Sequence, residues 1–114
     1  MTMSTLADLS TPLRALRMLS ADHPDLPVPT VRVSPFYPDR LCLAFHSISD
    51  TTLPLAAFEA WRTALGVPED AVDGRLQSGG RTWALEAWSE YAGATVELTA
   101  YADTDRTEGR GGVL

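Results

Sequence analysis

The sequence predicts a two-layer α+β domain, in which an antiparallel sheet of about five strands carries two helices on one face, in the order α-β-β-α-β-β-β. Two segments have apolar residues at helical spacing, and each is followed by segments in which apolar and polar residues alternate. Two-residue turns between the last three segments set registers that gather apolar side chains on one face. The length of 114 residues is that of one ordinary domain.

The first helix is expected in residues 11–22, TPLRALRMLSAD. Thr11 is a suitable N-cap, and Pro12 suits the first helical position, where its missing N–H leaves no hydrogen bond unmade. The predicted apolar stripe consists of Leu13, Leu16 and Leu19. Residues 1–10 are expected to be a flexible segment, and the three prolines in residues 24–29 predict an extended connection after the helix.

Residues 30–34 and 40–48 are predicted to be two strands joined by the loop PFYPD. If Ser34 lies opposite Arg40, one face of this hairpin is apolar. That face consists of Val31, Val33, Leu41 and Leu43.

The second helix is expected in LPLAAFEAWRTALG, residues 53–66. Thr51 or Thr52 caps its start, and Gly66, followed closely by Pro68, ends it. The predicted buried stripe consists of Leu55, Phe58, Trp61 and Leu65.

Three strands are predicted after this helix, in residues 75–78, 81–91 and 94–102. Gly79-Gly80 and Ala92-Gly93 are the turns between them. These turns give one apolar face, with Leu76 opposite Trp83, Leu85 opposite Ala100, Ala87 opposite Leu98, and Ser89 opposite Val96. The domain is therefore expected to span residues 11–102, followed by a disordered tail, 103–114.

Composition excludes several classes of function. The net charge is -6, and the nine basic residues, all arginine, are scattered along the chain, so nucleic-acid binding is not expected. The single cysteine, Cys42, excludes an internal disulfide and fits a reducing compartment. We see neither a signal peptide nor the run of roughly 20 apolar residues that a membrane span needs, and we therefore expect a cytoplasmic protein.

Reactive side chains do not converge in the sequence. Cys42 and His46 share one face of a predicted strand, but a separation of four residues puts their Cα atoms roughly 13 Å apart. A zinc site needs four ligands, and the other histidine, His23, lies in a distant proline-rich turn. The acidic residues of the tail lack the spacing of a calcium loop. We therefore expect no catalytic residue, no cofactor and no metal ligand.

Trp88 is the residue that the predicted sheet leaves unexplained. The register places it on the polar outer face with Glu86, Glu97 and Tyr101. Three explanations remain open: a β-bulge that turns Trp88 inward, coverage by the first helix or the tail, and contact with another molecule. The third makes Trp88, Tyr101, Glu86 and Glu97 the candidate interface residues. The carboxylates are interpreted as a solvated row rather than as an acid–base pair.

The stretches LRALRMLSADHPDLPVPTVRVS, FEAWRTALGV and the final hairpin resemble small uncharacterised proteins of Streptomyces-type actinobacteria, some of them carried by phages or integrated elements. The resemblance implies no activity and no functional residues.

Two hypotheses of function follow. The first is a non-enzymatic interaction module that binds a protein partner, or a second copy as a homodimer, through the outer sheet face. The alternative is a small-molecule-binding protein or enzyme with a pocket between helices and sheet, lined by Trp61, Trp83 and His46.

Overall fold

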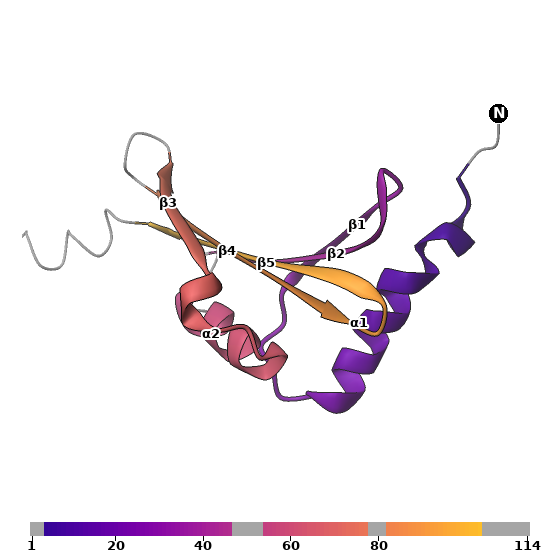
Figure 1. Ribbon diagram of the computed structural model, residues 1–114, viewed down its shortest axis with the longest axis horizontal. Coiled ribbons are helices and arrows are strands. Elements are labelled where there is room, and N and C mark those ends of the chain that lie inside the picture. Colours follow the sequence, from indigo (N-terminus) through magenta and orange to yellow (C-terminus); the bar gives the residue numbers. More distant parts are fainter. Residues whose placement is uncertain (1–3, 47–53, 78–81, 104–114) are drawn as a thin grey trace, which may run out of the picture.

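The computed structural model of the chain describes residues 4–46, 54–77 and 82–103 (Figure 1). Within them lie the helices α1 (Ser10–Asp22) and α2 (Pro54–Leu65) and the short 3₁₀ helices η1 (Leu6–Leu9) and η2 (Glu69–Ala71). The same residues contain the strands β1 (Thr30–Ser34), β2 (Tyr37–His46), β3 (Asp73–Gln77), β4 (Thr82–Tyr91) and β5 (Ala94–Asp103). The order of helices and strands is the predicted one.

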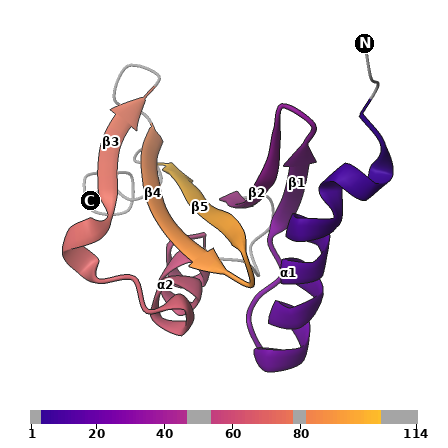
Figure 2. The same ribbon diagram turned by 45° about the vertical axis from the view of Figure 1, so that its right-hand side comes forward.

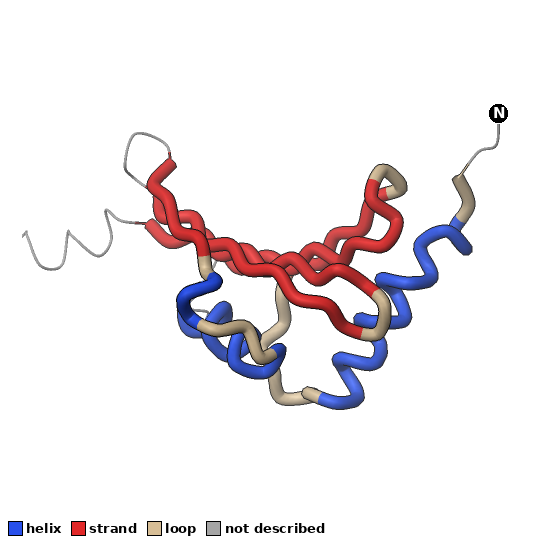
Figure 3. Tube along the Cα trace, viewed as in Figure 1, coloured by secondary structure: helices blue, strands red, loops and turns tan. Residues whose placement is uncertain are grey.

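All of these strands belong to one sheet, with the order β1-β2-β5-β4-β3. Figures 1 and 3 show α1 and α2 on the same side of the sheet, where α1 packs mainly on β2 and α2 mainly on β5. We call this side the inner face and the opposite side the outer face. The predicted two-layer α+β architecture is thus confirmed.

The middle of the sheet differs from a purely antiparallel arrangement. Strands β2 and β5 are parallel, whereas the other neighbouring pairs are antiparallel. A parallel pair needs a long crossover connection, and here the chain passes through α2, β3 and β4 before β5 enters beside β2. β5 is therefore the middle strand, with two strands on each side.

The last three strands have the predicted register. Leu76 pairs with Trp83, Leu85 with Ala100, Ala87 with Leu98, and Ser89 with Val96. Ala92 and Gly93, with φ of 53° and 85°, form the turn between β4 and β5. Two positive φ angles are what a type I′ turn requires, and its twist matches that of the strands. The predicted turn Gly79-Gly80 lies outside the described residues.

The first hairpin needs one correction. Val31 pairs with Leu43 as predicted, but Ser34 pairs with Tyr37 and not with Arg40, and the register shifts between Arg32 and Ser34. A two-residue turn follows Ser34, whose hydroxyl accepts a hydrogen bond from the Phe36 N–H at 3.2 Å. β2 therefore begins three residues earlier than expected. Between the pairs Arg32–Cys42 and Ser34–Tyr37, β2 contains three more residues than β1, and this irregularity separates the turn register from the predicted register of Val31 and Leu43.

α1 confirms part of the predicted stripe, because Leu19 is buried and Leu16 packs partly buried against the core, but Leu13 does not belong to it. Its buried residues are Pro12, Ala15 and Leu19, while Leu13 is 41% exposed. The small Pro12 and Ala15 allow the helix to approach β2 closely, which turns Leu13 away from the sheet. The helix starts at Ser10, after η1, which lies in the segment expected to be flexible. At the other end, Asp22 accepts a hydrogen bond from the Tyr91 hydroxyl.

α2 ends as predicted at Gly66, whose φ is 75°. The Val67 N–H donates to the Arg62 carbonyl at 3.0 Å, which is the closing bond of a Schellman motif. Phe58 and Trp61 are buried, as are Pro54 and Ala57, but Leu55 of the predicted stripe is 47% exposed. The Trp61 indole N–H donates to the Pro27 carbonyl at 2.8 Å. The predicted caps Thr51 and Thr52 lie outside the described residues.

The core fills the space between the helices and the inner face. The apolar residues of β2 and β5 with at most 2% exposure are Leu41, Leu43, Phe45, Ala94, Val96, Leu98 and Ala100. Phe58 and Trp61 of α2 and Leu19 of α1 pack in the same cluster. Period-2 alternation in β2 and β5 therefore puts one set of side chains into the core and the other set on the outer face. Among the described residues, we find no helix of the length and apolarity that crossing a membrane requires.

Truncating a core residue of the middle strand tests this packing. Leu98 has 0% exposure, and Leu98→Ala is expected to lower the free energy of unfolding by about 3 kcal/mol, because lost burial and an unfilled cavity both contribute. The measurement is urea denaturation followed by circular dichroism. Leu6, 75% exposed, is the control, since Leu6→Ala should change that free energy by less than about 0.5 kcal/mol. Equal effects of the two substitutions would contradict the packing.

Candidate functional site

The outer face consists of rows of side chains that run across the sheet. In one row Thr95 of β5 pairs with Arg40 of β2 and with Glu90 of β4. In the next row Glu97 pairs with Cys42 and with Trp88 in the same way. In the described part of the chain, both α-helices lie on the other face, so these side chains face away from them (Figures 1 and 3).

Trp88 points outward. Its pairing with Glu97 belongs to a regular ladder that runs without a shift from Thr82 to Tyr91, so the bulge that would turn it inward does not occur. The indole is 41% exposed. Coverage by α1 is excluded as well, because α1 lies on the inner face (Figure 1). Coverage by the tail concerns residues 104–114, which lie outside the described residues.

Arg40 is held between two aromatic rings. Its guanidinium carbon lies 4.1 Å from the ring centroid of Tyr37 and 4.9 Å from that of Trp88. Because Arg40 belongs to β2 and Trp88 to β4, the two side chains make this contact across β5, which lies between those strands. Each contact is a cation–π interaction worth about 0.5–1 kcal/mol where it is exposed. Within the described residues Arg40 has no salt bridge, so the N–H edge of its guanidinium is available to a carboxylate from outside.

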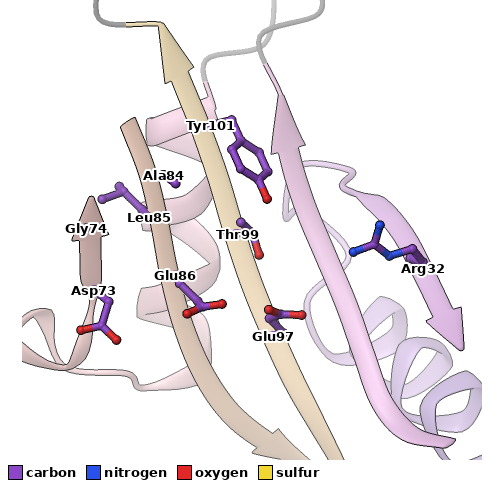
Figure 4. Close-up of a pocket in the computed structure, with 9 residues that line it drawn as sticks. All are labelled: Arg32, Asp73, Gly74, Ala84, Leu85, Glu86, Glu97, Thr99 and Tyr101. Carbon is purple, nitrogen blue, oxygen red and sulfur yellow. The ribbon is translucent and has the colours of Figure 1, made fainter. Parts of the chain in front are cut away.

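A polar hollow lies beside this cluster, between β3 and β1 (Figure 4). Its volume is about 320 Å³. Figure 4 shows Arg32 on the β1 side and Asp73 on the β3 side, with Glu86 and Glu97 between them. The lining residues are Arg32, Asp73, Gly74, Ala84, Leu85, Glu86, Glu97, Thr99 and Tyr101. The absence of a side chain at Gly74 has a packing reason, because a Cβ there would lie 3.0 Å from the Leu85 side chain.

A second hollow, of about 100 Å³, lies over β2. Its lining includes the small residues Cys42 and Ala44 of β2 together with Arg32, His46 and Tyr101. The rings of His46 and Tyr101 stack with centroids 5.0 Å apart and an interplanar angle of 14°. The histidine ring thus packs on the tyrosine ring.

Cys42 is in an environment that keeps its thiol protonated. Burial raises the pKa of this thiol, and the hydrogen bond and negative charge of Glu97 raise it further, against the smaller opposing effects of Arg32 and Arg40. Since the thiolate is the reactive form, this arrangement disfavours nucleophilic chemistry at Cys42. The described residues contain no group of three or more His, Cys, Asp or Glu side chains placed to hold a metal ion.

The structure brings all four candidate interface residues, Trp88, Tyr101, Glu86 and Glu97, to the outer face. Two further residues, Tyr37 and Arg40, belong to the same surface. Sequence reasoning placed Tyr37 in a loop and Arg40 at a strand end. The spacing of three residues between Tyr37 and Arg40 could have indicated that these two side chains meet. The contact of Arg40 with Trp88 could not be predicted in this way, because it depends on β5 lying between β2 and β4.

The residues of the alternative pocket are not brought together. Trp61 is buried on the inner side, 6.3 Å from Phe45 between ring centroids, whereas His46 stacks on Tyr101 on the outer face. Trp83 is 43% exposed near the sheet edge that β3 forms.

Comparison with known proteins gives no family assignment, since the chain matches no protein-family model, no curated protein and no solved structure.

The pH dependence of Cys42 alkylation tests the environment of this thiol. The reaction with iodoacetamide should reach half of its maximal rate at a higher pH than with a model cysteine peptide, because the folded protein raises the thiol pKa. Glu97→Gln should lower that midpoint, because it removes a negative charge and replaces the carboxylate acceptor of the thiol hydrogen bond by a weaker, neutral one.

Glu90→Gln is the matched control, since it removes a negative charge from the same face one row away from Cys42. A midpoint at or below that of the peptide in the wild type would contradict the described environment.

Proposed function

We propose that this protein acts as an interaction module, which binds another protein molecule through the outer face of its sheet and performs no chemistry of its own. The observation that carries this proposal is the surface cluster of Tyr37, Arg40 and Trp88. Trp, Tyr and Arg are the residue types that dominate the binding energy of protein interfaces. Here the three are in contact on a sheet face that the described helices leave open.

Exposure supports this use of the cluster. Tyr37 is 55% and Trp88 is 41% exposed, so two large aromatic surfaces remain in contact with water in the isolated chain. Burying such surface against a partner is favourable by about 25 cal/mol per Å² of apolar area. The rings also hold the Arg40 side chain in place, which reduces the conformational entropy that a hydrogen bond to a partner would cost.

Polar side chains around the cluster suit an interface rim. Thr95, Glu90 and Glu97 lie next to Arg40 or Trp88 in the rows of the outer face. An apolar centre with charged surroundings is the usual anatomy of a protein interface. The raised thiol pKa of Cys42 and the stacking of His46 on Tyr101 support a non-enzymatic role. A cytoplasmic location, in which a single cysteine stays reduced, completes the proposal.

Site-specific photo-crosslinking in the cells that make the protein tests this function. Tyr37 is replaced by p-benzoylphenylalanine, and the adducts formed on illumination are resolved by mass. We expect a discrete adduct, and we expect Trp88→Ala in the same chain to reduce its yield about tenfold or more, as loss of a central aromatic residue does at interfaces.

Leu55 of α2, 47% exposed, is the control position, since it lies on the helix layer and should give no discrete adduct. Absence of any adduct at residue 37, or equal adducts at residues 37 and 55, would overturn the proposal.

A further inference from the structure

We infer that the partner on the outer face is a second copy of this chain, related by a two-fold axis that runs parallel to β5. This inference rests on the proposed function, because it names the partner for the same surface. It follows from the position of β5, the distribution of charge, the placement of Trp88 and the twist of the sheet.

The charges of the outer face are divided between its two halves. Among residues with described side chains, the arginines of this face, Arg32 and Arg40, belong to β1 and β2. The carboxylates Asp73, Glu86 and Glu90 belong to β3 and β4. The middle strand β5 separates the two halves. Among the described side chains, charge is therefore divided across the strand direction.

This polarity selects one symmetric arrangement. A half-turn about an axis parallel to β5 places β2 of one copy over β4 of the other, and β1 over β3. Each positive half then meets a negative half, and it does so twice, because a two-fold interface uses every contact in both directions. An axis perpendicular to the strands would place like halves over each other, which is electrostatically unfavourable.

The row through Thr95 identifies the charge pair. Arg40 and Glu90 are both paired with Thr95, one on each side of β5. The half-turn therefore brings Arg40 of one copy opposite Glu90 of its partner. Within one chain these two residues are separated by β5 and form no salt bridge in the described structure.

The next row pairs a large side chain with a hollow. Glu97 separates Cys42 on β2 from Trp88 on β4. The half-turn thus places the partner's indole over the hollow of about 100 Å³ that Cys42 and Ala44 help to line. The half-exposed tryptophan gains an apolar contact, and the same hollow exists on both copies.

The shape of the sheet is compatible with this arrangement. The tip of β3 and the β1–β2 hairpin rise above the outer face at opposite ends of the sheet (Figures 1 and 2), as expected for a twisted sheet. A uniformly twisted sheet keeps its shape after a half-turn about its middle strand, so two copies present matching surfaces. Three strands of ten residues and two of five, at the usual rise and strand spacing, cover roughly 600 Å² per copy as a flat surface. This area is near the roughly 800 Å² per partner of standard interfaces.

Charge reversal across the axis tests the inference. The mass of the full-length chain is measured by light scattering over a dilution series. The wild type should be a dimer that dissociates on dilution, and Arg40→Glu or Glu90→Arg alone should each raise the dissociation constant about tenfold or more, because each places like charges opposite one another twice.

Mixing the two variants is the decisive step. In the mixed dimer, the new carboxylate of the Arg40→Glu copy faces the new guanidinium of the Glu90→Arg copy. At the second site, the unchanged Glu90 of the first copy faces the unchanged Arg40 of the other. Equimolar mixing should therefore restore dimers to near the wild-type dissociation constant. A wild-type monomer at every soluble concentration, or a dimer that neither variant weakens, would overturn the inference.

A second measurement is independent of these substitutions. A spin label at residue 95 in a Cys42→Ser background lies on the middle strand, near the proposed axis. Its distance to the same label on the partner should be shorter than for a label at residue 13, which is 41% exposed on α1 on the other side of the sheet. Equal distances, or a longer one at residue 95, would overturn the inference even if a charge variant failed to fold.

The crosslinking experiment separates this inference from the proposed function. An adduct of twice the chain mass at residue 37 agrees with a second copy. An adduct with a different protein, together with a monomeric wild type, would overturn the second copy and leave the outer face as the binding surface. Absence of any adduct would overturn both.

Discussion

The insertion of β5 between β2 and β4 is the constraint on which the rest of this structure depends. It makes β5 the middle strand and joins two halves of the sheet that come from distant parts of the chain. On the inner face it places Val96, Leu98 and Ala100 at the centre of the core, with almost no exposure. On the outer face it places Glu97 beside Cys42 and Tyr101 beside His46. The core and the candidate site are thus two sides of one strand.

This shared origin explains why the outer face is ordered although no described element covers it. Side chains of β5 alternate between the faces, so the packing that fixes Leu98 also fixes the neighbouring Glu97 and Thr99. The neighbours across β5 are fixed in the same way, and the side chains of Arg40 and Trp88 can therefore make contact across the strand. A binding surface on a sheet has less freedom than one on a loop, and less conformational entropy is lost when a partner binds.

Sequence reasoning was reliable where local rules apply. Gly66 ends α2, Ala92-Gly93 turns the chain with two positive φ angles, and the register of the last three strands follows from that turn and from the apolar pattern. It was wrong where packing decides. Leu13 and Leu55 fit the helical stripes but are exposed, because the smaller Pro12, Ala15 and Ala57 are the residues that approach the sheet. Ser34 was misaligned because the additional residues of β2 between Tyr37 and Cys42 leave no signal in the alternation.

The sequence by itself determined the α+β class, the order of helices and strands, and the outer-face positions of Glu86, Glu97 and Tyr101, because these depend on periodicity and on turns between neighbouring segments. For Trp88 it left an inward bulge open, which the uninterrupted ladder between β4 and β5 excludes. The tertiary structure alone decided that β2 and β5 are parallel neighbours. The contact of Arg40 with Trp88 and the division of charge across the outer face follow from that pairing. The physical reason is that pairing between strands far apart in the chain depends on how all the elements share one core, and no local pattern encodes it.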